Sequence, residues 1–173
     1  LRGWSTADPG QQALRRSYVD HLVARPDAMT RRAHPAHLTA GVLVLSGDRR
    51  EVLLTLHRKA RRWFHLGGHC EPGDETLAQA ALREGSEESG IEGLRLSPGP
   101  LHLDAHRVAF CGGHPEVTHL DVRYLALAPT GARPVVSEES LAVRWWPVDG
   151  LPDGADDLAA LVAAGLARAA AER

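Results

Sequence analysis

The chain has 173 residues, of which 43% are hydrophobic and 24% are charged. This length and composition are typical of one folded domain and exclude both a multidomain assembly and a disordered chain. Its 20 basic and 22 acidic residues give a net charge of -2, which excludes the basic surface of a protein that binds duplex nucleic acid. Two cysteines without a C-x-x-C spacing exclude a disulfide scaffold and favour a reducing compartment, so we expect a cytoplasmic protein.

The predicted elements begin with a helix over residues 10–25, where Leu14, Tyr18 and Leu22 recur at four-residue spacing before Pro26. We interpret residues 1–36 as an N-terminal helical extension and residues 37–173 as the main domain. The elements expected in that domain are strands at 38–45 and 51–57, a glycine-rich loop at 67–73, a helix at 75–89 ended by Gly90, strands at 101–109, 118–127 and 141–148, and a final helix at 156–171. Strands mixed with helices in this order predict an α/β or α+β sandwich with a mixed sheet. The longest apolar runs are far shorter than the roughly 20 residues of a membrane helix, so we expect no membrane partner.

Three glutamates on the predicted helix 75–89 carry the clearest chemical pattern. Glu84, Glu87 and Glu88 stand at positions i, i+3 and i+4, so they project from one helix face. A solvated acidic face is the simpler interpretation of such a cluster. However, Ala81 continues the same stripe, which predicts that the face packs inward. Like charges at this spacing repel, so we expect a cation among them.

Carboxylate oxygens grouped in this way suit Mg²⁺ or Mn²⁺ bridging to a phosphate, whereas Zn²⁺ favours histidine and cysteine. The glycine-rich loop before the helix would let backbone groups approach a phosphate or a cation closely. Loop, helix and metal therefore predict phosphate chemistry.

Residues 68–91 resemble the Nudix box, which that family writes as G-x5-E-x7-R-E-U-x-E-E-x-G-U, where U is aliphatic. The Arg-Glu, Glu-Glu and Gly-Ile pairs match in register. The resemblance implies a Nudix-type α/β/α sandwich and hydrolysis of a nucleoside diphosphate linked to another moiety, such as a nucleotide, a nucleotide sugar, ADP-ribose or a dinucleoside polyphosphate. It further implies that Mg²⁺ or Mn²⁺ is bound by Glu84, Glu87, Glu88 and the Gly68 carbonyl, and that Arg83, Glu84 and Glu87 act in catalysis.

The sequence departs from the box at three positions. Six residues separate Gly68 from Glu75 where the pattern has five, so the carboxylate that orients the arginine is either Asp74 or Glu75. Gly85 occupies the first aliphatic position, where it weakens a helix by about 1 kcal/mol relative to alanine. Leu66 stands where many relatives have proline. None of these changes removes a metal ligand, although a degenerate box is also the mark of a non-catalytic Nudix-fold sensor or scaffold that binds a nucleotide.

Two other segments are candidate parts of the site. Glu139, shortly before a predicted strand, is the preferred general base, and a surface turn is the alternative. Arg58, Arg62 and Trp63 belong to a basic cluster that would bind a polyphosphate while the indole stacks on a base, and a solvated loop is the alternative.

Polar side chains alternate along two predicted strands, with His102, Asp104 and His106 on one and His119, Asp121 and Arg123 on the other. If the strands form a hairpin with His106 opposite His119, Asp104 lies opposite Asp121. We predict that these rows line the substrate cleft or hold an accessory transition-metal ion, with Arg123 as the rival partner of the aspartates. An exposed strand face is the simpler alternative.

Two further patterns in the sequence have simple interpretations. The runs beginning at His37 and His119 look alike and are interpreted as two similar strands, not as a repeat. Cys111 opens a Cys-Gly-Gly-His-Pro run that we interpret as an ordinary turn. The expected partner is a small nucleotide-type diphosphate, and a homodimer is left open.

Overall fold

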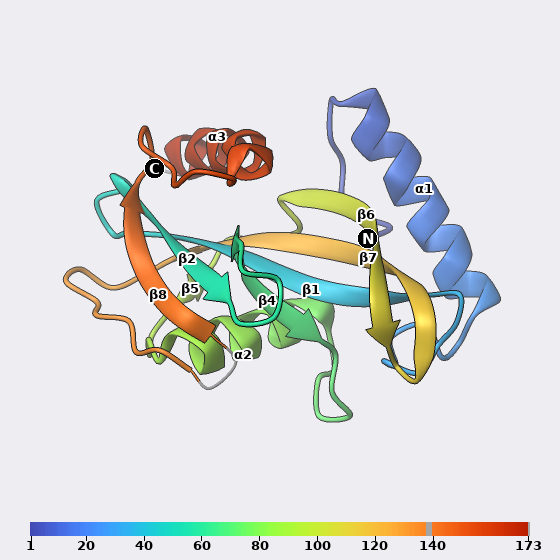
Figure 1. Ribbon diagram of the computed structural model, residues 1–173. Helices are drawn as coiled ribbons and strands as arrows, with labels where there is room; N and C mark the ends of the chain where they lie inside the picture. The colour runs from blue at the N-terminus through green and yellow to red at the C-terminus, as the bar shows by residue number, and fades with distance from the viewer. Residues whose placement is uncertain (138–139, 173) are drawn as a thin grey trace.

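A mixed sheet of eight strands forms the centre of the computed structural model, which describes residues 1–137 and 140–172 (Figure 1). The elements in chain order are α1 (Pro9–Ala24), β1 (Ala36–Leu45), β2 (Glu51–His57), β3 (Trp63–Phe64), β4 (Leu66–His69), α2 (Leu77–Ser89), β5 (Arg95–Leu96), β6 (His102–Cys111), β7 (His114–Leu127), β8 (Ser140–Pro147) and α3 (Asp156–Ala171). The predicted α/β class with a mixed sheet is confirmed. Among the described residues, no helix has both the length and the apolar character needed to cross a membrane.

Strand β1 is central, because it pairs in parallel with β7 and antiparallel with β2 and β4. Its pairing with β7 sets His37 beside His119 and continues in register to Leu45 beside Leu127. The two runs of similar sequence are therefore neighbouring strands whose side chains share the same faces. Strands β6 and β7 form a long antiparallel hairpin, and β8 extends the sheet beyond β2.

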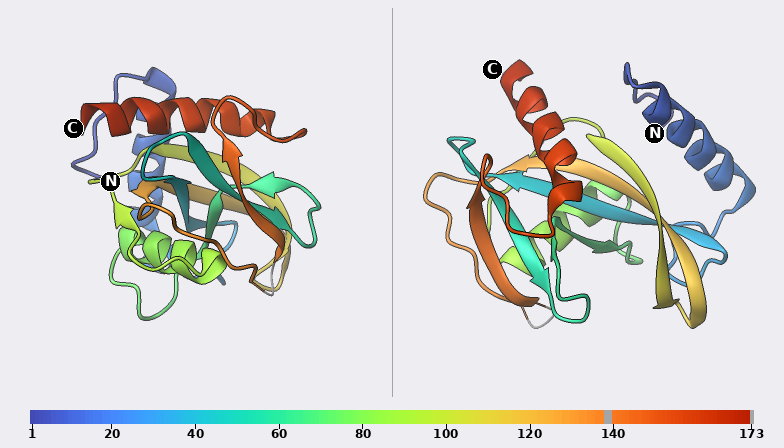
Figure 2. Two further views of the ribbon diagram at one scale, coloured as in Figure 1. Left: turned by 90° about the vertical axis from the view of Figure 1, so that its left-hand side faces the viewer. Right: turned by 45° about the horizontal axis from the view of Figure 1, so that its top comes forward.

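Alternation along β1 builds two hydrophobic cores, one on each face of the sheet. Val42 and Val44 pack in the core that contains Ala80 of α2, whereas Leu43 packs in the core that contains Leu161 of α3. Figures 1 and 2 show α2 on one face of the sheet and α3 on the other, with α1 beside β6. The predicted α/β/α layering is confirmed.

Helix α1 lies within one residue of its predicted position and is fixed at both ends. The carboxylate of Asp8 accepts a hydrogen bond from the Gly10 amide at 2.7 Å, and Pro9 occupies the first helical position. In the middle of the helix, Tyr18 is fully buried, and its hydroxyl donates to the backbone carbonyl of Asp104 on β6 at 2.5 Å. The helix is therefore packed onto the sheet, whereas the predicted boundary between residues 36 and 37 stays a prediction.

Two predicted loops are strand ends in the structure. Gly67 and Gly68 pair with β1, and a Cβ on Gly67 would lie 2.6 Å from the Ala40 carbonyl oxygen, so glycine here allows close strand pairing and the predicted loop starts only after His69. Cys111 ends β6, and the hairpin turns at the two glycines that follow it. The interpretation of this run as a turn is confirmed at Gly112 and Gly113, whereas Cys111 itself is the last residue of β6 and is buried.

Candidate active site

The start of α2 is fixed by a capping box, which sets the orientation of its glutamates. The Thr76 hydroxyl accepts from the Gln79 amide at 3.1 Å, and the Gln79 side chain accepts from the Thr76 amide at 3.1 Å. Gly90 ends the helix in the left-handed region with φ of 65°. The helix predicted at 75–89 is confirmed, with its first helical residue at Leu77.

Arg83 lies at the centre of a cluster of carboxylates. Its guanidinium donates to Asp74 at 2.9 Å, to Glu84 at 3.1 Å and to Glu87 at 3.0 Å, and it also donates to the backbone carbonyl of His69 at 2.9 Å. The hydrogen bonds to Asp74 are the main reason why the pKa of Arg83 is raised above its usual range. One cation among three carboxylates leaves an excess of negative charge at this face of α2.

The structure selects Asp74 over Glu75 as the carboxylate that orients Arg83. The Asp74 side chain is only 7% exposed, and its second contact is the backbone amide of Glu71 at 2.8 Å. Hydrogen bonding from Arg83 is the main cause that lowers the pKa of Asp74, so this carboxylate is ionised throughout the neutral range. Glu75 is exposed instead. The lengthened loop therefore still delivers a carboxylate to the arginine.

The two glycines of β4 bring the backbone against the helix glutamates. A Cβ on Gly68 would lie 2.5 Å from a carboxylate oxygen of Glu84, and the Gly67 amide donates to Glu88 at 2.9 Å. Glu84 is 16% exposed, whereas Glu87 is 60% exposed. The prediction that this helix face packs inward therefore holds for Glu84 but is wrong for Glu87, which lies on the solvent side of Arg83.

This donor set fits a hard divalent cation. Carboxylate oxygens of three glutamates and a peptide carbonyl beside them are oxygen ligands of the kind that Mg²⁺ and Mn²⁺ prefer. The close approach of Glu84 to Gly68 leaves no space for a side chain at position 68. Glu84, Glu87, Glu88 and Gly68 are thus brought together by the structure as the sequence predicts.

The predicted polar rows do lie side by side on the β6–β7 hairpin. His106 pairs with His119 and Asp104 with Asp121, which confirms the expected register. Arg123 lies between the two aspartates, 2.9 Å from Asp104 and 2.8 Å from Asp121. Arg123 was the predicted rival of an accessory metal ion, and it supplies the positive charge between the two aspartates.

Asp121 is the most enclosed carboxylate of these rows. Besides Arg123, it accepts a hydrogen bond from the Thr39 hydroxyl at 2.9 Å and contacts the His65 ring at 3.3 Å. Burial alone would raise the pKa of Asp121, but the hydrogen bonds and charges of His65 and Arg123 hold it below its usual range. The sequence did not indicate His65, because this residue comes next to Asp121 only when β4, which follows it, pairs with β1.

The two histidines that were expected to contact substrate have different surroundings. His106 is 44% exposed and contacts Asp104 at 2.8 Å. His119 is more enclosed and lies 3.4 Å from the Cys111 sulfur, beside His37 and His69. The structure thus places His119 in a second cluster, which adjoins the polar rows through an edge-to-face contact of the His119 and His106 rings at 5.5 Å.

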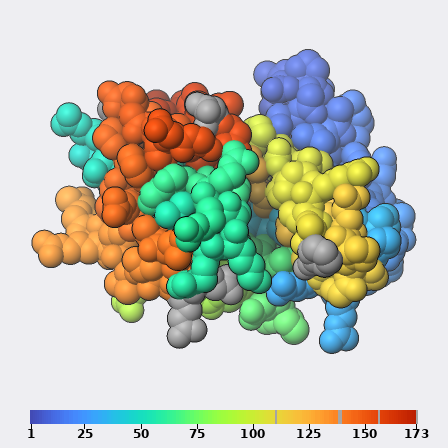
Figure 3. Space-filling model, viewed as in Figure 1, coloured from blue at the N-terminus to red at the C-terminus, as the bar shows by residue number. Residues whose placement is uncertain are grey.

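The predicted basic cluster lies on another part of the molecule. Arg62 contacts the Gly154 carbonyl at 3.2 Å, and Trp63 packs edge-to-face on Trp146 at 5.2 Å in the core beneath α3. Arg58 donates to the backbone carbonyl of Ser140 at 3.2 Å. Figure 3 shows the chain between β2 and β4, in green, between α3 in red and β6 in yellow. The structure therefore does not join Arg62 and Trp63 to the glutamates on the opposite face, and their substrate contacts stay a prediction.

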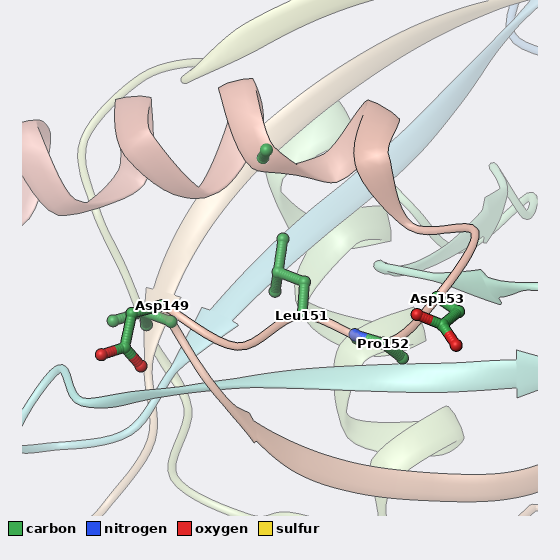
Figure 4. A pocket seen from close by; sticks show the side chains of 6 residues that line it. Asp149, Leu151, Pro152 and Asp153 are labelled. Atoms are coloured by element: carbon green, nitrogen blue, oxygen red, sulfur yellow. The ribbon is translucent and has the colours of Figure 1, made fainter.

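A pocket of about 330 Å³ lies between β8 and α3, on the far side of the sheet from α2. In Figure 4, Leu151 points toward α3, whereas the carboxylates of Asp149 and Asp153 point away from that helix. The two aspartates that line this pocket would repel a phosphate, so we do not assign the substrate to it. The predicted base, Glu139, lies outside the described residues.

Comparisons with known proteins agree with this geometry. A family model described as the NUDIX domain matches residues 35–165. The chain is similar to the solved C. elegans Ap4A hydrolase in a binary complex, with 21% identity and a TM-score of 0.60 over 78% of this chain and 98% of that one. It is also similar to a NUDIX-family hydrolase from Clostridium perfringens, with 21% identity and a TM-score of 0.58 over 79% of this chain and 98% of the other.

A third structure, an ADP-ribose pyrophosphatase from Streptococcus suis, has 17% identity and a TM-score of 0.57 over 79% of this chain and 93% of its own. At these identities the solved structures support the shared fold. A search of curated proteins finds no significant match.

Proposed function

This chain belongs to the Nudix family, and from that premise we propose that it hydrolyses the diphosphate linkage of a nucleoside diphosphate joined to another moiety. The observation that carries the proposal is the arrangement of Asp74, Arg83, Glu84 and Glu87 beside Gly68. The proposed substrates are a nucleotide, a nucleotide sugar, ADP-ribose or a dinucleoside polyphosphate. The similarity to an Ap4A hydrolase and to an ADP-ribose pyrophosphatase supports including the last two.

The proposed cofactor is Mg²⁺ or Mn²⁺, held by Glu84, Glu87, Glu88 and the Gly68 carbonyl. A bound divalent cation would polarise phosphoryl oxygens and lower the pKa of a water molecule. The protein itself keeps the ligands oriented, because Arg83 hydrogen-bonds to Glu84 and Glu87 while the Gly67 amide hydrogen-bonds to Glu88. Asp74 in turn fixes Arg83, as a positioning residue that acts through the guanidinium.

A glutamate is proposed to take the proton from the attacking water, and Glu139 is our candidate for that base. Arg58, Arg62 and Trp63 are proposed to bind the substrate, as is His106 at the exposed edge of the hairpin. His119, proposed from the sequence for the same role, lies in the more enclosed cluster with His37, His69 and Cys111. Both cysteines are free, which supports a cytoplasmic location, and a homodimer is left open.

The proposal is tested by incubating the purified protein and Mg²⁺ with nucleoside triphosphates, dinucleoside polyphosphates, nucleotide sugars and ADP-ribose, and separating the products by chromatography. We expect at least one member to be cleaved at a phosphoric anhydride bond, and a chelator to stop the reaction. No turnover at micromolar enzyme overturns the proposal. Tight nucleotide binding by calorimetry with no product in the same tube would instead support a non-catalytic sensor.

A further inference from the structure

Three histidines and a cysteine converge at one end of the sheet, away from the carboxylates of α2. His37 lies near the start of β1, His69 ends β4, Cys111 ends β6 and His119 lies on β7. One ligand atom from each lies within 4.8 Å of all the others. The Cys111 sulfur is 3.3 Å from Nε2 of His69, 3.4 Å from Nε2 of His119 and 3.7 Å from Nε2 of His37.

The three sulfur–nitrogen separations match the spacing of ligands around one tetrahedral metal ion. With Zn–N bonds of about 2.0–2.1 Å and a Zn–S bond of about 2.3 Å, tetrahedral geometry sets nitrogen and sulfur ligands about 3.5 Å apart. Hydrogen bonding alone accounts for them less well, since a thiol has one proton and donates to only one of the three nitrogens. The other contacts would depend on sulfur as a weak acceptor.

The position of the proton on the His37 ring also favours a metal site. Its Nδ1 lies 3.1 Å from the carbonyl oxygen of Ala33, which can only accept a hydrogen bond. Nδ1 therefore carries the proton, and the neutral ring presents the Nε2 lone pair to the Cys111 sulfur. A metal-binding histidine typically has its other nitrogen bonded to a carbonyl or a carboxylate in this way.

The surroundings also favour the neutral imidazoles that bind metals. Burial disfavours the charged imidazolium form of a histidine. His37 is fully buried and Cys111 is 5% exposed, whereas His69 and His119 are partly exposed, so solvent reaches the cluster only in part.

We propose that His37, His69, Cys111 and His119 form a four-coordinate structural site for Zn²⁺. Its nitrogen and sulfur donors select a borderline or soft transition metal, whereas the oxygen donors of α2 select a hard one. Four protein ligands leave no coordination position for water, so the ion stabilises the fold and does not take part in hydrolysis.

The site connects the end of the β6–β7 hairpin to β4 and to the loop that follows it. His69 is next to Gly68 in sequence, and its backbone carbonyl accepts the hydrogen bond from Arg83 at 2.9 Å. A metal bound to the His69 ring would therefore hold this carbonyl in place from the opposite side of β4. This role does not depend on which substrate the enzyme cleaves.

The first test is elemental analysis of the protein purified without chelators, for which we expect about one equivalent of zinc, because a closed structural site retains its ion. Apoprotein titrated with Co²⁺ is expected to give the intense visible bands of a tetrahedral site and a sulfur-to-cobalt charge-transfer band. Cys111→Ser is expected to lose that band and His119→Ala to lose most of the metal. His106→Ala is the matched control and is expected to keep both, since this exposed ring lies 5.5 Å from the His119 ring and outside the cluster.

Stability provides a second measurement. We expect removal of zinc to lower the Tm of the wild type by roughly 5–10 °C, reversibly, and to have little effect on Cys111→Ser. Glu87→Gln is expected to keep its zinc while losing hydrolysis, so failure of the zinc site and failure of the proposed activity can be told apart. Apoprotein that takes up no Zn²⁺ and gives only the weak bands of octahedral Co²⁺ would overturn the proposal. If Cys111→Ser does not fold, the cobalt spectrum of the wild-type apoprotein decides.

Discussion

The carboxylate site and the histidine–cysteine cluster differ in how far apart in the sequence their residues lie. Asp74, Arg83, Glu84 and Glu87 all come from one segment of a loop and a helix, and the capping box and helical periodicity set their geometry. The second cluster draws its residues from four strands, and strand register sets its geometry. The first site can therefore be recognised in the sequence as a motif, whereas the second becomes visible only when the strands are paired.

The largest effect is expected at the locally built site, for the substitution Glu87→Gln. We expect kcat with Mg²⁺ to fall roughly 100- to 1000-fold, because the substitution removes one charged oxygen ligand from the cation that stabilises the transition state. Since the side chain is 60% exposed, we expect the free energy of unfolding to change by less than about 0.5 kcal/mol. Steady-state kinetics and thermal unfolding of the same samples measure the two quantities.

Glu71→Gln is the matched control for this experiment. Glu71 is 65% exposed and approaches the same guanidinium only to 3.9 Å. We expect this variant to retain its activity. Equal losses of kcat in the two variants would mean that the overall negative charge around Arg83, and not a specific metal ligand, supports the reaction.

The second largest effect is expected for the ion pairs of Arg123, of which the one with Asp104 forms only when β6 and β7 pair. Arg123→Gln removes the positive charge between Asp104 and Asp121, which lie directly opposite each other on β6 and β7. We expect unfolding to become easier by about 3–5 kcal/mol, because the buried Asp121 loses the guanidinium that lies 2.8 Å from it and, among the described residues, keeps only His65 as a cationic partner. Urea denaturation measures the change, and adding Asp104→Asn is expected to restore part of it by removing the opposed charge.

An exposed ion pair on the same hairpin serves as the control. Arg107 and Glu116 lie 3.1 Å apart across the two strands, but their side chains are 76% and 60% exposed. Arg107→Gln is therefore expected to cost less than about 1 kcal/mol. If Arg123→Gln lowers the free energy of unfolding no more than this control does, the enclosed ion pairs stabilise the fold no more than an exposed one.

The sequence predicts the periodic elements of this fold well, and it predicts part of the long-range pairing. The helices and longer strands are confirmed, and so is the pairing of His106 with His119, because alternating polar residues define a strand face. The strands β3 and β5 were missed, since two residues are too short to show alternation. Gly67 and Gly68 were assigned to a loop because the sequence does not show how closely β1 approaches them.

In the candidate sites, too, the sequence predicts what local periodicity sets and misses what strand pairing or loop conformation sets. Helical spacing predicts that Glu84, Glu87 and Glu88 come together, but the choice of Asp74 over Glu75 depends on the loop backbone. His37 and Cys111 depend on the register of β1, β6 and β7. The likeness of the runs 37–45 and 119–127 was the only sequence pattern that could have indicated that His37 and His119 lie side by side.

A third test examines the loop register through pH. Asp74 has a folded pKa below its ordinary value because Arg83 hydrogen-bonds to it, so its ionised form stabilises the folded state at pH values above the unfolded pKa. That stabilisation is lost as the pH falls through the lowered folded pKa. We expect Asp74→Asn to cost about 1–3 kcal/mol at pH 7, and the difference from the wild type to shrink below about pH 4.

Glu75→Gln is the control, because Glu75 is exposed and is the alternative in the other loop register. We expect its free energy of unfolding to follow that of the wild type at every pH. Guanidinium denaturation between pH 3 and pH 7 compares the three proteins. A larger loss for Glu75→Gln than for Asp74→Asn would reverse the assignment of the orienting carboxylate.

The smallest effect is expected where the local helix meets the long-range sheet, at Gly85. This glycine occupies a box position that is usually aliphatic, and the structure gives the reason. A Cβ there would lie 2.9 Å from Cγ1 of Val42 and 3.2 Å from Cδ1 of Leu94. Alanine would favour the helix by about 1 kcal/mol but would crowd the core by about 1–3 kcal/mol. We therefore expect Gly85→Ala to destabilise the protein by about 1 kcal/mol in denaturant titrations.

A double-mutant cycle with Val42→Ala shows whether crowding against β1 is the cause. Val42→Ala alone leaves a space at the helix–strand contact, and the added methyl group of Gly85→Ala would fill part of it. We expect the double variant to be more stable than the sum of the single effects by about 1 kcal/mol. Gly73→Ala is the control, since nothing lies within 4 Å of a Cβ at that loop position. Strict additivity between positions 42 and 85 would mean that the helix does not need glycine to approach the sheet, and that this departure from the family pattern has another origin.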